Sequence, residues 1–471
     1  MMKITKKIVR NLGLFLVLMM ASCDSYLDVN ENPNNPEDAP ISGLMINSTY
    51  ESAKNIFRVG DITSNYVQYL ASPNPASASD TMEPVSNNNT WFNIYNVMTD
   101  LTVLIEKAEE QEANHYKGAA QVLMALNLGM GVDIFGDMPF SESFTFETVT
   151  PSYDDDEQLY AMIMDFLDEG INNLQGETTV SMGEDDFIYQ GDTTKWIAFA
   201  NMLKARYMIH AKETSDYSAS EVLAAIDNGF QSIDDDAKVA FFEQDINPWA
   251  DVARDNADLL LGGWISEQFI QALDGTSYPA VDPRLGLMVG TTDDDTFVGT
   301  VNGAGRGNAP EQGARSTLVE DQYYTTITSP ILIATYSEQK FIEAEAAFEI
   351  DKNRSYQAYL AGIRAHMEML EVPQEEIDTY LADPSVSMGE GAFALEDIFK
   401  EKWVALFLHP ETWNDARRFD YQYKDMDVPV NLNPDLNGQF IRRLPYPDNE
   451  VSRNGQNVPD VTLLDRIFWD E

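Results

Sequence analysis

Apolar residues recur at three- and four-residue intervals through most of this chain, which is the spacing of one face of an α-helix. The spacing predicts helices over residues 91–110, 113–132, 156–174, 194–212, 220–230, 336–350, 356–370 and 395–408. Several of these segments follow one another in pairs with short connections. We therefore expect a fold dominated by α-helices.

Small residues indicate how neighbouring helices pack. Alanines recur on the faces that would meet, at Ala344, Ala347, Ala358, Ala361 and Ala365. This resembles the helix-turn-helix unit of tetratricopeptide repeats, although no regular period of about 34 residues is visible. The sequence predicts an all-α scaffold of degenerate, tetratricopeptide-like helix pairs.

The helical spacing fades between residues 233 and 335, where Gly, Asn, Asp, Pro and Thr cluster. An irregular stretch of this length inside a compact domain is unusual and is commonly functional. The region 421–460, with its Pro-Tyr-Pro sequence, has a similar character. We expect an irregular, loop-rich, ligand-facing side on the helical scaffold, centred on residues 233–335.

The N-terminus has the features of an export signal. Residues 1–10 carry four basic side chains and no acid, and an apolar run over 12–21 leads to the small residues before Cys23. The run is too short to span a bilayer, which needs about 20 residues in a helix. Residues 1–22 are therefore predicted to be a lipoprotein signal peptide.

Cys23 is the only cysteine, and it lies where a bacterial lipobox places its acylated residue, with Met20 where leucine is usual. We expect lipid on Cys23 to hold the protein at a membrane. Residues 23–40, rich in Asn, Pro and acids, are predicted to form an extended tether. Residues 41–471 are predicted to form a single helical domain.

The chain carries 30 Lys and Arg against 78 Asp and Glu, a formal net charge of −48. A nucleic-acid partner is excluded, since phosphate binding needs a basic surface. The charge also favours a soluble, solvated surface.

No histidine pattern indicates a metal site. None of the four has a second ligand at metal-binding spacing, and they are His115, His210, His366 and His409. His115 and His210 lie on predicted helices, and we expect both at the surface or the edge of the core. We predict no metal and no cofactor.

Catalytic motifs are also missing from the sequence. The aspartate runs 154–156, 234–236 and 293–295 are predicted to be solvated loops or helix N-caps rather than calcium sites. No nucleophile elbow, phosphate-binding loop or dinucleotide fingerprint is present. We predict that the protein is not an enzyme. A surface glycoside hydrolase remains the alternative, since 78 acids offer many carboxylate pairs.

Aromatic residues make up 11% of the chain, and some fall in polar loop segments. Flat rings suit sugar faces, while the other interpretation is that these rings fill the core. Trp196, Trp403 and Trp413 are predicted to be core residues. The candidate ligand-binding residues near Asn- and Asp-rich segments are Tyr66, Tyr69, Trp91, Trp249 and Trp264.

Five stretches in order resemble the SusD/RagB family of outer-membrane nutrient-binding lipoproteins of Bacteroidetes. They are the arm CDSYLDVNENPNNP, FGDMPFSESF at 135–144, TYSEQKFIEAEAAF at 335–348, EKWVALFLHPETWNDARRFDY at 401–421 and RRLPYPDNEVSRN at 442–454. They span nearly the whole mature chain, so the resemblance is specific as a set.

The resemblance implies one α-rich fold with about four tetratricopeptide-like helix pairs. It implies a surface-exposed, lipid-anchored protein of the cell outer membrane that acts as a lid on a SusC-like TonB-dependent transporter and delivers oligosaccharides to it. The helical side would meet the transporter. The shared residues Trp413, Arg417 and Arg418 would serve the fold.

Two alternatives within this picture stay open. Relatives also bind oligopeptides, so the cargo could be a peptide. The protein could also be a structural subunit that closes the transporter without contacting the ligand. No family motif identifies the ligand-binding residues in this sequence.

Overall fold

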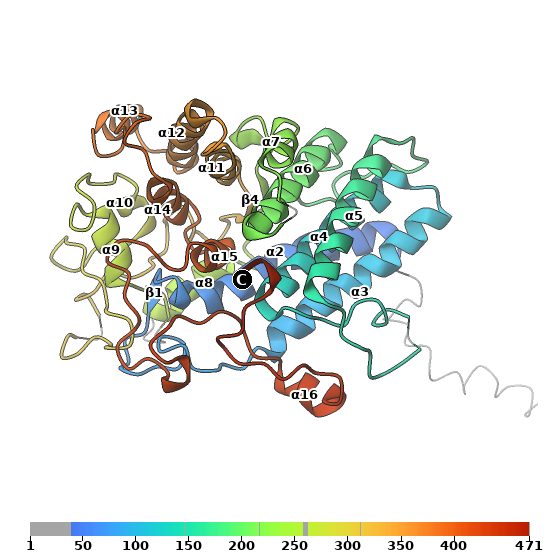
Figure 1. The fold of residues 1–471 in the computed structure, drawn as a ribbon, viewed down its shortest axis with the longest axis horizontal. Helices are drawn as coiled ribbons and strands as arrows, with labels where there is room; N and C mark the ends of the chain where they lie inside the picture. Colours follow the sequence, from blue (N-terminus) through green and yellow to red (C-terminus); the bar gives the residue numbers. More distant parts are fainter. Residues whose placement is uncertain (1–38, 146, 216, 258–261, 311, 471) are drawn as a thin grey trace, which may run out of the picture.

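The computed structural model describes residues 39–145, 147–215, 217–257, 262–310 and 312–470 (Figure 1). The predicted signal peptide over 1–22, Cys23 and most of the predicted tether over 23–40 lie outside these residues. Helices dominate the described part of the chain, which confirms the predicted all-α fold.

Long helices build the N-terminal part, and neighbours in sequence pack side by side (Figure 1). They are α2 (Ile41–Tyr66), α3 (Asn88–Glu110), α4 (Asn114–Phe135), α5 (Asp156–Gln175) and α6 (Thr193–His210). Helix α4 packs between α3 and α5, and α6 packs on α5. Helix α4 is long and apolar enough to cross a membrane, but it is buried in this bundle as a core helix.

Shorter helices continue the packing in the C-terminal part. They are α7 (Ala219–Asp227), α11 (Tyr336–Ala347), α12 (Lys352–Met369), α13 (Gln374–Ala382), α14 (Leu395–Ala405), α15 (Glu411–Arg418) and α16 (Asp448–Asn454). Helices α11 and α12 form a tight pair, and α11 also contacts α7 and α14. The helix pairs predicted over 336–370 are present, and their boundaries differ by a few residues.

Residues 233–335 contain only short elements joined by loops, as the composition predicted. The elements are β2 (Ala237–Val239), α8 (Pro248–Ala257), β3 (Trp264–Ile265), α9 (Glu267–Leu273), α10 (Leu285–Met288) and β4 (Ile331–Ala334). Strand β3 pairs antiparallel with β1 (Leu70–Ala71), and β2 pairs antiparallel with β4. Helices α9 and α10 lie at the left of Figure 1, away from the bundle of α3, α4 and α5.

The longest helix in the described residues, α2, was absent from the predicted helices. Its buried face mixes apolar residues such as Ile56 and Val59 with polar ones that interrupt the apolar repeat, namely Ser48, Ser52, Asn55 and Thr63. Small hydroxyl groups bond to the carbonyl four residues earlier, as Thr63 Oγ1 does to Val59 at 3.0 Å. Such a helix can be buried because its side chains find partners within the helix and on α4.

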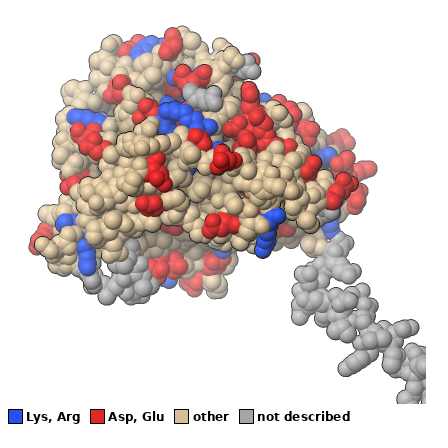
Figure 2. All heavy atoms as spheres, turned by 60° about the horizontal axis from the view of Figure 1, so that its bottom comes forward, with Lys and Arg blue, Asp and Glu red and all other residues tan. Residues whose placement is uncertain are grey.

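The aspartate runs agree with the prediction only in part. Asp155 is the N-cap of α5, where its carboxylate accepts from the backbone N–H of Gln158, as predicted. Asp236 is buried instead of solvated, and its Oδ1 accepts from the N–H of Tyr336 at 2.7 Å. Acidic side chains far outnumber basic ones on the face drawn in Figure 2, and no continuous basic surface is seen there.

Two facing glycines set the distance between α4 and α5. A Cβ atom added to Gly118 would lie 2.7 Å from the carbonyl oxygen of Gly170 and 2.9 Å from the backbone nitrogen of Leu174. Both neighbours are backbone atoms, so they cannot rotate away. This contact therefore requires glycine at position 118.

We expect Gly118→Ala to lower the free energy of unfolding by about 1–3 kcal/mol, because the helices must move apart. Urea unfolding followed by circular dichroism measures this change. Gly391→Ala is the matched control, since a Cβ at Gly391 meets nothing within 4 Å. Equal stability of the two variants would contradict the close packing of α4 on α5.

Candidate functional site

The five predicted ligand-binding aromatics do not meet on one surface. Tyr66, Tyr69, Trp249 and Trp264 are each no more than 3% exposed, whereas Trp91 is half-buried. Trp91 packs on Tyr95 and Phe135 at the start of α3, with ring centroids 4.9 and 5.0 Å away. The five candidates therefore do not form a single binding surface.

Three of these rings are enclosed by other aromatic side chains. Tyr69 is stacked on Trp403 with centroids 5.5 Å apart, and its hydroxyl is 2.9 Å from the Thr412 hydroxyl. Trp249 meets Phe57 edge to face at 4.8 Å. Tyr66 packs against Trp413 with ring centroids 5.4 Å apart and the ring planes tilted by 54°. These rings have no face open to a sugar in this structure, which is the core-filling role that the sequence left as the other interpretation.

Trp264 differs because it lines a pocket large enough for a small molecule, whereas the pocket beside Trp249 has a volume of only about 30 Å³. The pocket has a volume of about 360 Å³ and lies in the loop-rich region, where Trp264 is joined by Asn256, Thr291, Asp293, Arg315 and Thr317. Its volume is within the range of roughly 300–1,000 Å³ that small-molecule sites occupy. We take this Trp264 pocket as the candidate binding site.

The backbone around Trp264 fixes its position. Residue 264 pairs with Ala71 of β1 on one side and bridges to Thr317 on the other. The preceding Gly263 has φ +66°, and a Cβ there would lie 3.2 Å from Cβ of Leu318. Leu318 donates its N–H to the carbonyl of Gly263 at 2.7 Å. Glycine is needed at 263 to bring the two segments together and aim the indole into the pocket.

Two buried donors at this pocket have no partner among the described residues. They are the indole Nε1 of Trp264 and the Nε of Arg315. A buried donor left without an acceptor costs about 1–3 kcal/mol. Ligand oxygens that accept these bonds would recover that cost. Asp293 supplies an exposed carboxylate acceptor, and Asn256 an amide with both functions.

A second pocket of about 330 Å³ adjoins the start of α9. Its lining includes the side chains of Glu267, Gln271, Asp425 and Asp427. Among the described residues that line it, none is aromatic. The pocket offers mainly acceptors, so the Trp264 pocket has the more varied hydrogen-bonding set.

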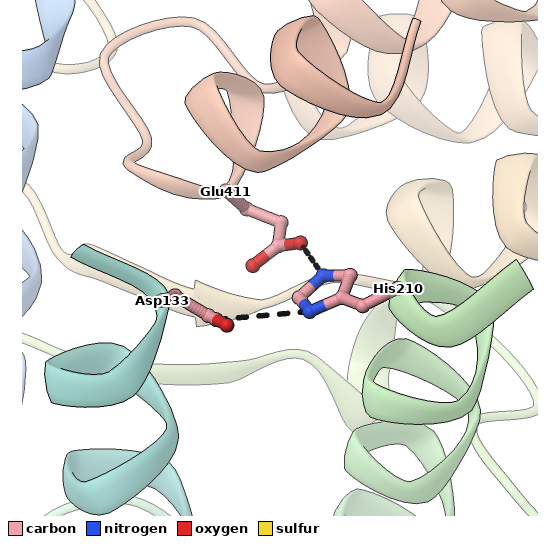
Figure 3. Close-up of side chains that lie close together, drawn as sticks. All are labelled: Asp133, His210 and Glu411. Carbon is pink, nitrogen blue, oxygen red and sulfur yellow. Dashed lines mark hydrogen bonds and ion pairs between the residues drawn. The ribbon is translucent and has the colours of Figure 1, made fainter. Parts of the chain in front are cut away.

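A second cluster of chemical interest is buried between α4, α6 and α15. Asp133, His210 and Glu411 come from these three helices and point toward one another (Figure 3). His210 Nε2 is hydrogen-bonded to Glu411, and its Nδ1 is 3.7 Å from Asp133 Oδ2. The prediction that His210 lies at the surface or the core edge is wrong, since it is 1% exposed. Its partners are distant in sequence, so no local spacing could reveal them.

The donors around this cluster favour an ion-pair centre over a metal site. Asp133 accepts from Trp469 Nε1 and from Asn414 Nδ2, each at 3.0 Å, and also from the hydroxyl of Tyr160. Asn414 donates to Glu411 as well, at 3.1 Å. N–H and O–H groups thus point at the carboxylate oxygens that a metal would need. The ligands are committed to hydrogen bonds.

Burial and the neighbouring carboxylates shift the pKa of His210 in opposite directions. Burial lowers its pKa, but Glu411 and Asp133 outweigh burial and raise the pKa to about 9. Burial likewise raises the pKa of Glu411, and the charges of His210 and Arg206 bring it well below its ordinary value. His210 is therefore an imidazolium paired with a carboxylate at neutral pH.

The C-terminal motif with Trp413, Arg417 and Arg418 serves the fold, as the resemblance implied. Arg418 makes two bonds of 2.9 Å to the carboxylate of Glu345. Arg417 donates to the carbonyl of Asp133 at 2.6 Å and lies 4.0 Å over the ring of Trp413. Both arginines bond to groups inside the protein, with Arg418 Nε left without a partner among the described residues, and neither lines the Trp264 pocket.

We expect His210→Gln to destabilise the protein by roughly 3–5 kcal/mol at pH 6, because Glu411 would remain buried without its cation. The folded pKa of about 9 exceeds the ordinary 6.5, so the contribution of His210 is complete below pH 6.5 and is lost as pH rises through 9. The difference between wild type and variant should shrink by about 3 kcal/mol over this range.

Urea unfolding at a series of pH values measures this difference. His115→Gln is the control, because His115 bonds only at the surface, to the carbonyl of Gly176 at 3.1 Å. A difference between wild type and His210→Gln that stays constant from pH 6 to 9.5 would show that His210 is not charged in the folded state.

Comparisons of the sequence and of the fold with known proteins point to the same family. Residues 33–447 match the SusD-like model described as "starch-binding associating with outer membrane". No curated protein sequence matches the chain.

Solved structures of low sequence identity share the fold. A SusD/RagB family protein from Bacteroides thetaiotaomicron is 22% identical, with a TM-score of 0.74, over 92% of this chain and 99% of that one. A SusD homolog from Bacteroides fragilis is 19% identical, with a TM-score of 0.77, over 92% and 100%. A chitin-binding SusD homolog from Flavobacterium johnsoniae is 19% identical, with a TM-score of 0.75, over 91% and 98%.

The family match covers most of the chain, and the helical architecture agrees with it. The family associates with the outer membrane, and its description is that of a glycan-binding group. This chain belongs to the SusD/RagB family, in its SusD-like branch.

Proposed function

We propose that this protein binds an oligosaccharide in the Trp264 pocket at the cell surface and delivers it, as a lid, to a SusC-like TonB-dependent transporter. The observation that carries the proposal is the pair of buried, unpaired donors, Trp264 Nε1 and Arg315 Nε, at a pocket of the loop-rich region. The family's description as starch-binding and the fold shared with a chitin-binding homolog support a glycan ligand.

A sugar matches this set of groups. Each sugar hydroxyl both donates and accepts, so one hydroxyl can accept from Trp264 or Arg315 while another donates to Asp293. The ring of Trp264 is 3% exposed, so it has no open face for stacking on a sugar, and its contribution would be the hydrogen bond from its unpaired Nε1. The volume of about 360 Å³ accommodates a short stretch of glycan, not a long chain.

Binding without catalysis fits the carboxylates at the pocket. Glycoside hydrolysis needs two carboxyl groups in defined roles across the scissile bond. Of the two at this pocket, Glu320 accepts from Arg254 Nε at 3.0 Å. Asp293 is then left without a second free carboxylate. We therefore propose no enzymatic step.

The lid role rests on the N-terminal sequence. Lipid on Cys23 and a tether over 23–40 would hold the domain at the outer leaflet, close to its transporter. Tethering raises the effective concentration of one partner beside the other, to about the millimolar range for short linkers. Weak contacts between lid and transporter then suffice, and the lid can open and close repeatedly.

Isothermal titration of the detergent-solubilised protein with maltoheptaose, chitohexaose and a mixture of tripeptides tests the ligand class. We expect one of the oligosaccharides to bind. Trp264→Phe keeps one aromatic ring but removes the pyrrole ring with its N–H, so we expect roughly tenfold weaker binding, the value of one buried hydrogen bond.

Trp91→Phe is the matched control, because Trp91 lies at the start of α3, away from the Trp264 pocket, and we expect its affinity to match wild type. If only the tripeptides bind, the cargo is a peptide and the proposed glycan cargo is wrong. If wild type and Trp264→Phe bind a glycan with equal affinity, the glycan binds outside the Trp264 pocket.

A further inference from the structure

A groove of about 550 Å³ lies between α13 and residues 280–283. Ala280, Val281 and Pro283 form one wall, and α13 forms the other, beginning at Pro373. Val281, in the first wall, has a side chain that is 68% exposed. It is fixed by an antiparallel bridge to Asp274.

Buried charges tie the two walls together. Arg284 bonds to Asp282, directly after Val281, and to Glu401, both at 2.5 Å. Tyr380, which lines the groove from α13, donates its hydroxyl to the same Glu401 at 2.8 Å. Glu401 thus bonds both to Arg284, beside one wall, and to Tyr380 of the other, so the groove is a preformed feature of the fold.

The open side of the groove is acidic. Glu375 and Glu376 lie exposed in the first turn of α13, and Asp383 follows its end. No lysine or arginine is among the described residues that line it. Nearby, Arg364 is paired with Asp378 at 3.2 Å and Lys400 with Glu401 at 2.6 Å. The carboxylates at the mouth are thus not neutralised by these cations.

We propose that this groove binds a basic segment of a protein partner, with the aliphatic stem of a lysine or arginine along Val281 and its charge between Glu375 and Glu376. We expect the segment to carry apolar residues beside the basic ones, because the groove has an apolar wall and acidic residues at its mouth. The partner we assign to it is the transporter, so this inference rests on the proposed function.

Two features favour a polypeptide over a small cation. Lysine and arginine bury an apolar stem while their charge stays near water, which matches an exposed valine beside carboxylates. Complementary charge also steers a partner to one orientation. Acids in the first turn of α13 stabilise that helix through its dipole as well. That effect alone does not account for the apolar wall opposite them.

Calorimetric titration of the detergent-solubilised protein with acetyl-Lys-Leu-Lys-Leu-Lys-amide in 150 mM NaCl tests the groove. We expect measurable binding to wild type, and roughly tenfold weaker binding to E375Q/E376Q, because two partly exposed ion pairs are lost. V281S should weaken binding as well, since the stem loses its apolar contact.

The control is E106Q/E110Q, which removes the same charge from an exposed face of α3. If both double variants lose the same affinity for the peptide, the peptide is attracted to the acidic protein as a whole. That result would overturn the proposal that it binds in the groove. Cadaverine binding as tightly as the peptide would also overturn it, in favour of a small cation.

Glycan affinity measured in the same variants separates the two proposals. E375Q/E376Q should bind the glycan as wild type does, because neither residue lines the Trp264 pocket. Failure of wild type to bind any glycan, together with groove-dependent peptide binding, would overturn the proposed cargo and leave the groove supported.

Discussion

The ion pair between His210 and Glu411 is the interaction on which the arrangement of the helices depends. Charges buried this deeply are stable only where every partner is in place, and removing one leaves the other uncompensated. Arg206, on the same helix as His210, makes two bonds of 2.7 Å to Glu338 of α11. Helices α4, α6, α11 and α15 must therefore all be docked before these charges are satisfied. The centre fixes which helices pack together more strictly than apolar contacts would.

This centre also positions the loop-rich side. Helix α15 begins with Glu411 in the ion pair, and the next residue, Thr412, is 2.9 Å from the Tyr69 hydroxyl. Tyr69 precedes β1, and its carbonyl accepts from the N–H of Ser266 at 2.9 Å. Strand β3, with Trp264, is thereby held against β1. A continuous set of polar contacts runs from the buried charges to the candidate pocket, so the pocket is built on a rigid frame although loops surround it.

Local patterns in the sequence predicted the features that depend on near neighbours. Apolar spacing revealed α3, α4, α5 and α6, because their buried faces are apolar. It missed α2, whose face toward α4 carries Ser52 and Asn55, with Asn55 Nδ2 bonded to Asn127 at 3.0 Å. Trp264 was among the predicted ligand residues for its ring, but the ring is 3% exposed and has no face open to a sugar. Arg315 went unnoticed because its value lies in an unpaired Nε beside a pocket, which only the folded chain creates.

One segment joins the two proposed binding surfaces. Val281 forms a wall of the acidic groove, and ten to twelve residues later Thr291 and Asp293 line the Trp264 pocket. Between them, α10 is anchored by the buried Arg284, and the N–H of Gly290 bonds to the Thr317 carbonyl at 2.9 Å. Binding at two sites is coupled only through an element that responds to both. Because contacts hold this segment at both ends, it is the shortest covalent connection in the chain through which docking of a partner could affect cargo binding.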